Sequence, residues 1–188
     1  MAPSLILASS SPRRRELLQR AGYRFEVIEP VGVDESQRPG ERPEQLVARL
    51  ARDKAAHVAQ RVARGLVLGC DSVAECNGQI LGKPRDVEHA RRILLTLSGQ
   101  EHRVLTGLCL WPTPDGMPSV RIAQTVLYME PFSPERLDEY LAGSQWEGKA
   151  GAFGYQDGLD WVRVLQGSET NVVGLPMELL GEMLYSFE

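Results

Sequence analysis

The chain has 188 residues, of which 43% are hydrophobic and 24% are charged, and its formal net charge is −4 at pH 7. These totals predict one globular domain over residues 1–188 and argue against a general binder of nucleic acid. Three cysteines, Cys70, Cys76 and Cys109, have no ligand-like spacing, which argues against a disulfide framework and a zinc site. Without a signal peptide or a membrane-length apolar run, we expect a cytoplasmic protein with no membrane contact.

The first feature along the chain is an apolar run, Leu5–Ala8, followed by three serines, Pro12 and three arginines. The run predicts a buried strand, and Ser11 and Pro12 suit the N-cap and first position of a helix. Free N–H groups and the helix dipole favour an anion at such a helix start, whereas arginines in the first turn oppose the dipole. This turn is therefore either a phosphate site or a solvated basic turn.

The next segments predict a strand at 23–28, an acidic loop at 33–36 and a long helix over 43–64. Lys54 falls on the apolar stripe of that helix, four residues after Leu50. Its ammonium group either reaches out to solvent or points at something anionic.

The segment Gly65–Ala74 predicts a buried strand that carries Asp71 near its end. A buried carboxylate costs several kcal/mol unless it is paired or binds a metal, so Asp71 is the most informative residue of the chain. An Asn-Gly pair then predicts a type I′ hairpin that pairs Cys76 with Gln79 and, counting back, Ser72 with Lys83.

The remaining chain alternates between helical and strand patterns. We predict helices at 86–97, 134–141 and 177–185, strands at 103–111, 120–129 and 159–166, and a glycine-rich segment at 147–156. Intermixed strands and helices indicate an α/β fold with a mixed or parallel sheet covered by helices.

The candidate site combines cations with carboxylates and has no histidine or cysteine nucleophile. This set suits phosphate chemistry assisted by a hard divalent cation, because carboxylates hold Mg²⁺ or Mn²⁺ and cations neutralise phosphate oxygens. Its members are Ser9, Arg13, Arg14, Glu35, Lys54, Asp71 and Lys83.

Six segments resemble motifs of the Maf family, which are nucleoside triphosphate pyrophosphatases, in the family's order over about residues 5–184. They read S-S-S-P-R-R-R-E-L-L, A-R-D-K-A, C-D-S-V with L-G-K-P, L-S-G-x-x-H, K-A-G-A-F-G-Y-Q and N-V-V-G-L-P. The resemblance implies an elongated, two-lobed α/β fold with a mixed central sheet flanked by helices and a central cleft, like the inosine-triphosphate pyrophosphatases. It also implies hydrolysis of a nucleoside triphosphate to the monophosphate and pyrophosphate with Mg²⁺ or Mn²⁺, in a house-cleaning role linked to cell division.

Carried over by position, the resemblance makes Asp71 the catalytic proton acceptor and places Glu35 with it near the metal. The implied phosphate-side residues are Ser9, Arg13, Arg14, Lys54 and Lys83, and the implied specificity residues are Arg13, Ser72 and Gln156. Arg13 and Gln156 resemble the branch that prefers dTTP and UTP. The chain has Cys70-Asp71-Ser72 where the family usually has Ala-Asp-Thr.

Two other functions compete with this interpretation. A regulatory protein of cell division would bind the nucleotide as a sensor without turning it over. Nucleic-acid binding through residues 13–15 is disfavoured, because the protein is acidic and no aromatic platform interleaves with basic residues. A homodimer is a further expectation, with Trp146 as a candidate interface residue.

Overall fold

The computed structural model describes residues 4–187, which form two compact units. The first unit contains the chain up to Asp71, residues 106–123 and the chain from Gly174 onward; the second contains residues 72–105 and 124–173. Strands β3 (Gly65–Cys76), β5 (Glu101–Thr113) and β6 (Ser119–Met129) contribute residues to both units.

The strands form a mixed sheet with the order β2-β1-β3-β5-β6-β7, and β4 pairs with β3. β1 (Leu5–Ala8) runs parallel to β2 (Phe25–Val27) and to β3, whereas β4 (Gln79–Leu81) is antiparallel to β3 and β7 (Val162–Gln166) is antiparallel to β6. The predicted α/β class with a mixed sheet flanked by helices is confirmed.

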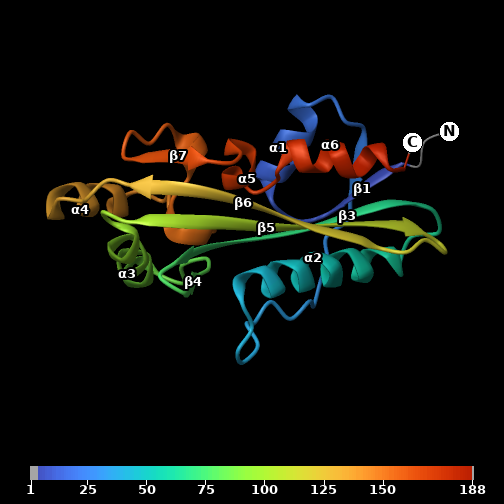
Figure 1. The fold of residues 1–188 in the computed structure, drawn as a ribbon, viewed down its shortest axis with the longest axis horizontal. Coiled ribbons are helices and arrows are strands. Elements are labelled where there is room, and N and C mark those ends of the chain that lie inside the picture. The colour runs from blue at the N-terminus through green and yellow to red at the C-terminus, as the bar shows by residue number, and fades with distance from the viewer. Residues whose placement is uncertain (1–3, 188) are drawn as a thin grey trace. The chain divides into compact units, whose positions relative to one another are not determined.

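Three helices cover the sheet of the first unit. Figure 1 shows α2 (Pro43–Ala59) on one face and both α1 (Pro12–Arg20) and α6 (Met177–Tyr185) on the other. No helix within residues 4–187 is both long enough and apolar enough to cross a bilayer.

The alternation of side chains along β1 explains these two layers. Leu5 and Leu7 belong to the apolar cluster that includes Leu18 of α1, whereas Ile6 and Ala8 belong to the cluster that includes residues of α2. Because successive side chains of a strand point to opposite faces, a fully apolar run such as β1 can be buried on both.

Helix α2 lies very close to the strands because two glycines leave room for its backbone. A Cβ at Gly69 of β3 would lie 2.1 Å from the Ala51 carbonyl oxygen, and one at Gly107 of β5 would lie 2.2 Å from the Val47 oxygen. Asp71 follows Gly69 by two residues and therefore faces the same helix.

We expect Gly69→Ala to lower the free energy of unfolding by about 3 kcal/mol, because overpacking that the backbone must absorb is costly. The matched control is Gly181→Ala in α6, where a Cβ meets no atom within 4 Å. The control should leave stability unchanged or raise it by up to about 1 kcal/mol, as alanine favours helix. Urea unfolding of both variants measures the difference, and equal stabilities would contradict the close packing.

The second unit surrounds its part of the sheet with short helices. These are α3 (Val87–Leu97), α4 (Pro134–Ala142), α5 (Glu169–Val173) and the 3₁₀ turns η1 (Ala150–Ala152) and η2 (Tyr155–Asp157). Their shared core contains Ile93, Leu94, Leu127, Phe153 and Trp161.

His102 lies inside this core with 2% of its surface exposed. Its ring meets Phe153 edge-on at 5.6 Å between centroids, and its Nδ1 lies 3.4 Å from the Gln100 carbonyl oxygen. Its Nε2 has no hydrogen-bond partner among the described residues. Burial lowers the pKa of the imidazole from 6.5 to about 4, although the Gln100 carbonyl and the charge of Glu75 act to raise it.

His102 should therefore make stability depend on acid. The folded state favours the neutral ring, so this contribution is complete above pH 6.5 and is lost as pH falls toward about 4. The full loss is about 3 kcal/mol. Unfolding free energies measured from pH 7 to pH 4 should fall less steeply for His102→Gln than for the wild type. Identical slopes for the two proteins would contradict the burial argument.

Most predicted elements are confirmed, with shifted ends. The helix predicted over 43–64 ends at Ala59, and the strand predicted over 23–28 keeps only three residues as β2. Helix α5 was not predicted, because it has five residues and lies between two loops.

The hairpin after β3 is confirmed only in its turn. Asn77 and Gly78 have φ of 51° and 81°, as a type I′ turn requires, and Cys76 pairs with Gln79. The predicted pairing of Ser72 with Lys83 is wrong, because the ladder ends where Ala74 meets Leu81 and the chain then leaves the sheet.

Trp146, the candidate interface residue, is half-buried. Its ring packs against the core of the second unit, and its Nε1 donates to the Leu141 carbonyl at 3.3 Å.

Candidate active site

The turn between β1 and α1 has the predicted geometry. The Oγ of Ser11 caps the helix by accepting from the Arg14 amide at 3.5 Å, and Pro12 occupies the first turn. Ser9 is buried, and its Oγ accepts from the Ser11 amide at 3.2 Å. The serines therefore shape the backbone of this turn.

Arg14 joins three distant segments of the first unit. Its Nε donates to the Gly174 carbonyl at 2.8 Å, and its Nη1 donates to the Cys70 carbonyl at 2.8 Å and to Ser9 Oγ at 3.2 Å. These contacts hold one positive charge beside the start of α1. Arg13 is half-buried on the same turn, and Arg15 is exposed.

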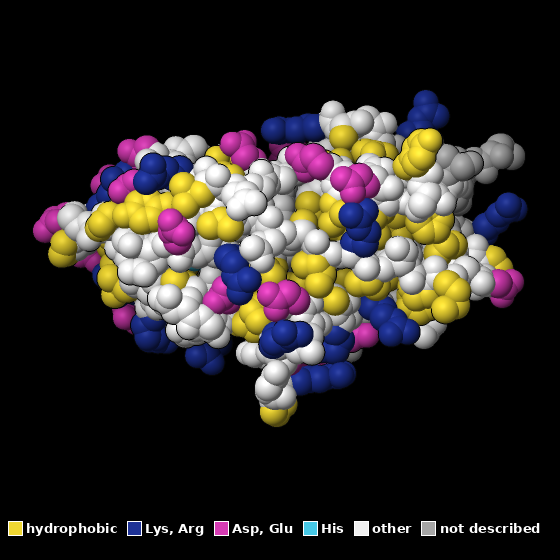
Figure 2. Space-filling view, in the orientation of Figure 1, with side chains coloured by type: hydrophobic (Ala, Val, Ile, Leu, Met, Phe, Trp, Pro, Cys, Tyr) yellow, Lys and Arg dark blue, Asp and Glu magenta, His cyan; other side chains and the backbone are white. Residues whose placement is uncertain are grey.

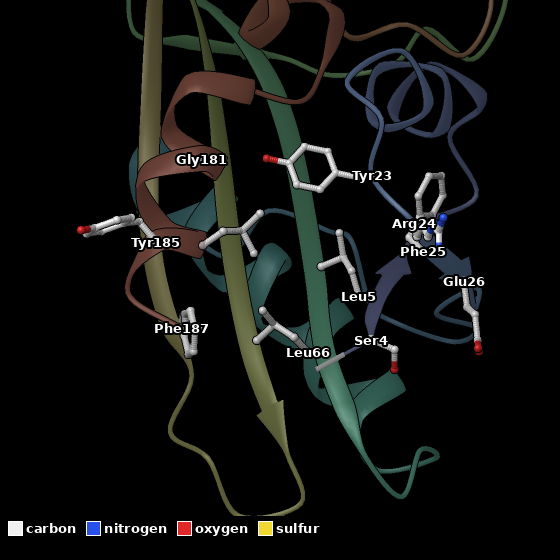
Figure 3. Close-up of a pocket in the computed structure, with 11 residues that line it drawn as sticks. Ser4, Leu5, Tyr23, Arg24, Phe25, Glu26, Leu66, Gly181, Tyr185 and Phe187 are labelled. Carbon is white, nitrogen blue, oxygen red and sulfur yellow. The ribbon is translucent and has the colours of Figure 1, made fainter. Parts of the chain in front are cut away.

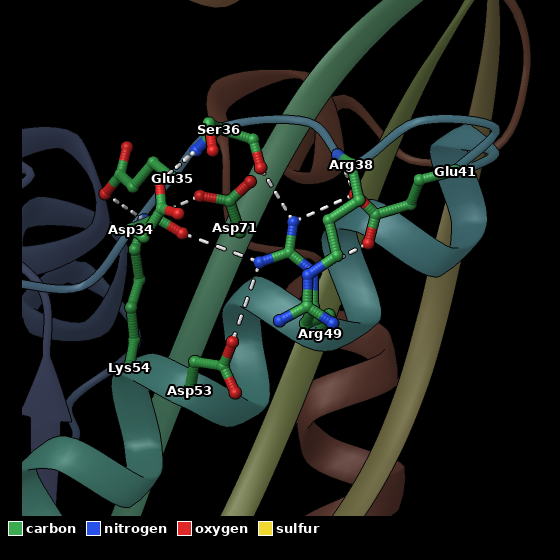
Figure 4. A network of polar contacts seen from close by, with 9 residues as sticks. All are labelled: Asp34, Glu35, Ser36, Arg38, Glu41, Arg49, Asp53, Lys54 and Asp71. Atoms are coloured by element: carbon green, nitrogen blue, oxygen red, sulfur yellow. Dashed lines mark hydrogen bonds and ion pairs between the residues drawn. The ribbon is translucent and has the colours of Figure 1, made fainter.

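Lys54 points at anions, which decides between the two orientations that its position allows. Only 5% of the residue is exposed, and its Nζ lies 2.6 Å from Asp71 Oδ1 and 2.7 Å from Glu35 Oε1 (Figure 4). Asp71 is 7% exposed, so it and Lys54 form a buried ion pair. Glu35 comes from the loop before α2, and half of its side chain is exposed.

The two carboxylates form a donor set that suits a divalent cation. Both lie within hydrogen-bond distance of the Lys54 ammonium nitrogen. Two carboxylates and one ammonium group give the three side chains a formal net charge of −1. No cluster of three or more His, Cys, Asp or Glu with metal-site geometry occurs in residues 4–187. Mg²⁺ is commonly held by one or two carboxylates, with water and substrate phosphates completing its shell, so the residues present fit such an ion.

Cys70 packs as a small apolar residue next to Asp71. It is fully buried, its Sγ donates to the Gly174 carbonyl at 3.2 Å, and burial raises the pKa of the thiol to about 11. The thiol is therefore protonated at neutral pH and is not a nucleophile.

The other three predicted site residues belong to the second unit. Lys83 is exposed just after β4, Ser72 is half-buried on β3, and Gln156 is exposed in η2. The loop that carries Lys83 lies beside η1, because the Gly151 amide donates to the Gly82 carbonyl at 3.2 Å. Two predicted motifs, L-G-K-P and K-A-G-A-F-G-Y-Q, therefore meet within this unit.

Sequence reasoning missed the part played by Gly174. Its carbonyl oxygen accepts from both Arg14 and Cys70, and a backbone acceptor leaves no trace in residue type. The available signal was the N-V-V-G-L-P segment, whose position next to the site was not predicted.

A separate apolar groove of about 680 Å³ lies between the first strands and α6 (Figure 3). Its lining includes Leu5, Tyr23, Phe25, Tyr185 and Phe187, and it shares none of the predicted site residues.

Comparison with known proteins identifies the family. A model of Maf-like proteins matches residues 4–187, and the chain therefore belongs to the Maf-like family.

Similar proteins cover almost the whole chain. One from Rhodopirellula baltica, named dTTP/UTP pyrophosphatase, is 50% identical over 190 residues, which span 98% of this chain and 82% of that protein. One of the same name from Gluconobacter oxydans is 40% identical over 187 residues, which span 97% of this chain and 86% of that protein. The solved structure of the Staphylococcus aureus Ham1 protein aligns over 98% of this chain and 100% of its own, with a TM-score of 0.54 and 16% identity, and shares the fold.

We expect Lys54→Met to lower the free energy of unfolding by about 3–5 kcal/mol, because it leaves Asp71 buried without its partner. Adding Asp71→Asn should recover part of this loss, since no unpaired buried charge then remains. Urea unfolding of the two single variants and the double variant completes a thermodynamic cycle. Additive losses would contradict a direct interaction between the two side chains.

Proposed function

We propose that this protein hydrolyses a nucleoside triphosphate, dTTP or UTP, to the monophosphate and pyrophosphate. The observation that carries the proposal is the buried Lys54–Asp71 pair with Glu35 beside it, in a chain of the Maf-like family. The relatives named dTTP/UTP pyrophosphatase support the substrate, because their similarity extends over nearly the whole chain.

In the proposed reaction, water attacks the α-phosphorus and the bond to the bridging oxygen breaks, which releases pyrophosphate. Asp71 accepts the proton of the attacking water, and Lys54 orients the carboxylate through its 2.6 Å contact. Only 7% of the surface of Asp71 is exposed, which keeps its carboxylate away from bulk solvent. Cys70 and His102 take no part, because burial keeps the thiol protonated and encloses the imidazole in an apolar core.

Cationic side chains would neutralise the triphosphate. Arg13 and Arg14 sit on the first turn of α1, where the positive end of the helix dipole also favours phosphate oxygens. Lys83 is proposed to contribute a further cation. Arg13, Ser72 and Gln156 are proposed to set the preference for the base.

Glu35 and Asp71 would hold the divalent cation, Mg²⁺ or Mn²⁺. When bound, such an ion lowers the pKa of coordinated water and offsets charge on phosphate oxygens.

Surface charge favours a small anionic substrate over a nucleic acid. On the face drawn in Figure 2, basic and acidic side chains are interspersed and form no continuous basic surface. The net charge of −4 points the same way.

The test is pyrophosphate release from a panel of canonical and modified nucleoside triphosphates, with Mg²⁺, Mn²⁺ or a chelator. We expect turnover of dTTP and UTP that needs the metal and falls by at least about 100-fold in Asp71→Asn, which removes the proton acceptor but keeps its shape. Circular dichroism confirms that the variant is folded.

Two results would change the proposal. Full activity of Asp71→Asn would remove the role assigned to that carboxylate. Nucleotide binding without turnover in the wild type would favour the nucleotide-sensing function linked to cell division.

A further inference from the structure

The loop that carries Glu35 has no regular structure of its own. Residues 33–42 contain no helix or strand, and the side chain of Glu35 is 50% exposed. Lys54 and Asp71, in contrast, project from a helix and a strand. Because sites on loops are less precise than sites on regular elements, something must fix this segment if Glu35 is to act there.

Arg49 of α2 contacts the backbone on both sides of Glu35. Its Nη2 donates to the Ser36 carbonyl at 2.9 Å, and its Nη1 makes a weaker contact with the Asp34 carbonyl at 3.5 Å. Figure 4 shows the guanidinium below the loop, with Glu35 directed toward Lys54 and Asp71. Helix α2 thus supplies Lys54 to the side chain of Glu35 and Arg49 to the backbone carbonyls of the residues on either side of it.

Glu41 fixes the guanidinium in turn. Its two carboxylate oxygens accept from Arg49 Nε at 2.6 Å and from Nη2 at 2.9 Å, the bidentate arrangement that orients a guanidinium most strictly. The side chains of Arg49 and Glu41 are 14% and 8% exposed, so water competes little for this pair. The hydrogen bonds from Arg49 lower the pKa of Glu41 to about 2, which keeps this carboxylate charged at neutral pH.

The loop closes on itself around the same pair. The Arg38 amide donates to Glu41 Oε2 at 3.0 Å, and Gln37 Nε2 donates to the Glu41 carbonyl at 3.0 Å. Ser36 is held from its other side, because its amide donates to Asp34 Oδ1 at 3.0 Å. The whole segment therefore has few ways to move once Arg49 is in place.

We propose that Arg49 is a positioning residue that holds the loop of residues 34–41 so that the Glu35 carboxylate stays beside Lys54 and Asp71. The proposal rests on the proposed function for the role of Glu35 toward a divalent cation. Arg49 itself takes no part in binding substrate. Its effect on activity passes through Glu35.

The experiment compares Arg49→Ala and Arg49→Lys with the matched control Arg52→Ala, an exposed arginine on the same helix. Two measurements need no turnover: Mn²⁺ binding followed by electron paramagnetic resonance, and hydrogen exchange of the amides of residues 34–37. We expect Arg49→Ala to weaken Mn²⁺ binding by about 10–100-fold, as for other residues that orient metal ligands, and to speed exchange in the loop. Arg49→Lys, which lacks the fork, should fall between the alanine variant and the wild type.

Activity supplies a second cycle. Arg49→Ala should lower kcat for dTTP, and high Mn²⁺ should restore part of the loss, which a general loss of stability would not allow. Arg49→Ala combined with Glu35→Gln should be no less active than Glu35→Gln alone. A further loss in the double variant would overturn the proposal, because Arg49 would then act by another route.

The remaining outcomes separate this inference from the proposed function. Unchanged Mn²⁺ affinity and unchanged exchange in a folded Arg49→Ala or Arg49→Lys would overturn the positioning role even if the wild type hydrolyses dTTP. A wild type without turnover would overturn the proposed function. The role of Arg49 would still be supported if the wild type bound Mn²⁺ more tightly, and exchanged its loop amides more slowly, than Arg49→Ala does.

Discussion

The buried contact between Lys54 and Asp71 is the interaction on which the rest of this structure depends. Each charge is nearly out of water, and each would be costly to bury alone. The pair ties the middle of α2 to the end of the first unit's share of β3. It also fixes the position of a third charged group, because the same ammonium nitrogen lies 2.7 Å from a carboxylate oxygen of Glu35. Stability and the proposed chemistry thus place demands on the same atoms.

Close packing makes that contact possible. Gly69 lets the α2 backbone lie directly on β3, so a lysine on the helix reaches a strand carboxylate without extending into solvent. Arg49 uses the same helix for the neighbouring loop. Three functions are therefore served by one helical segment: covering the sheet, pairing a buried carboxylate and holding a loop. The apolar stripe of α2 explains only the first of them.

Much of this was predictable from the sequence, and the exceptions have physical causes. Asp71 could be singled out because a charged residue in an apolar strand needs a partner, and Lys54 because it interrupts an apolar stripe. The family resemblance added Glu35, which local patterns alone would leave as one acidic residue among several. Arg49 was missed because its contacts are mainly with backbone carbonyls and with Glu41, neither of which has a sequence pattern. The ends of α2 and the hairpin ladder were misplaced because tertiary packing, and not local propensity, decides where pairing stops.

The contacts of Arg14 have a consequence for how this site tolerates sequence change. Its guanidinium donates to the carbonyl oxygens of Cys70 and Gly174, a group that every amino acid carries. Drift in side-chain type at position 70 therefore leaves the arginine's anchorage untouched, provided that the new side chain is small enough for a fully enclosed position. Cysteine is a side chain of this permitted size. Contacts with main-chain oxygens thus survive substitutions that would remove a contact with a side chain. Only the size of the neighbouring side chains is then constrained.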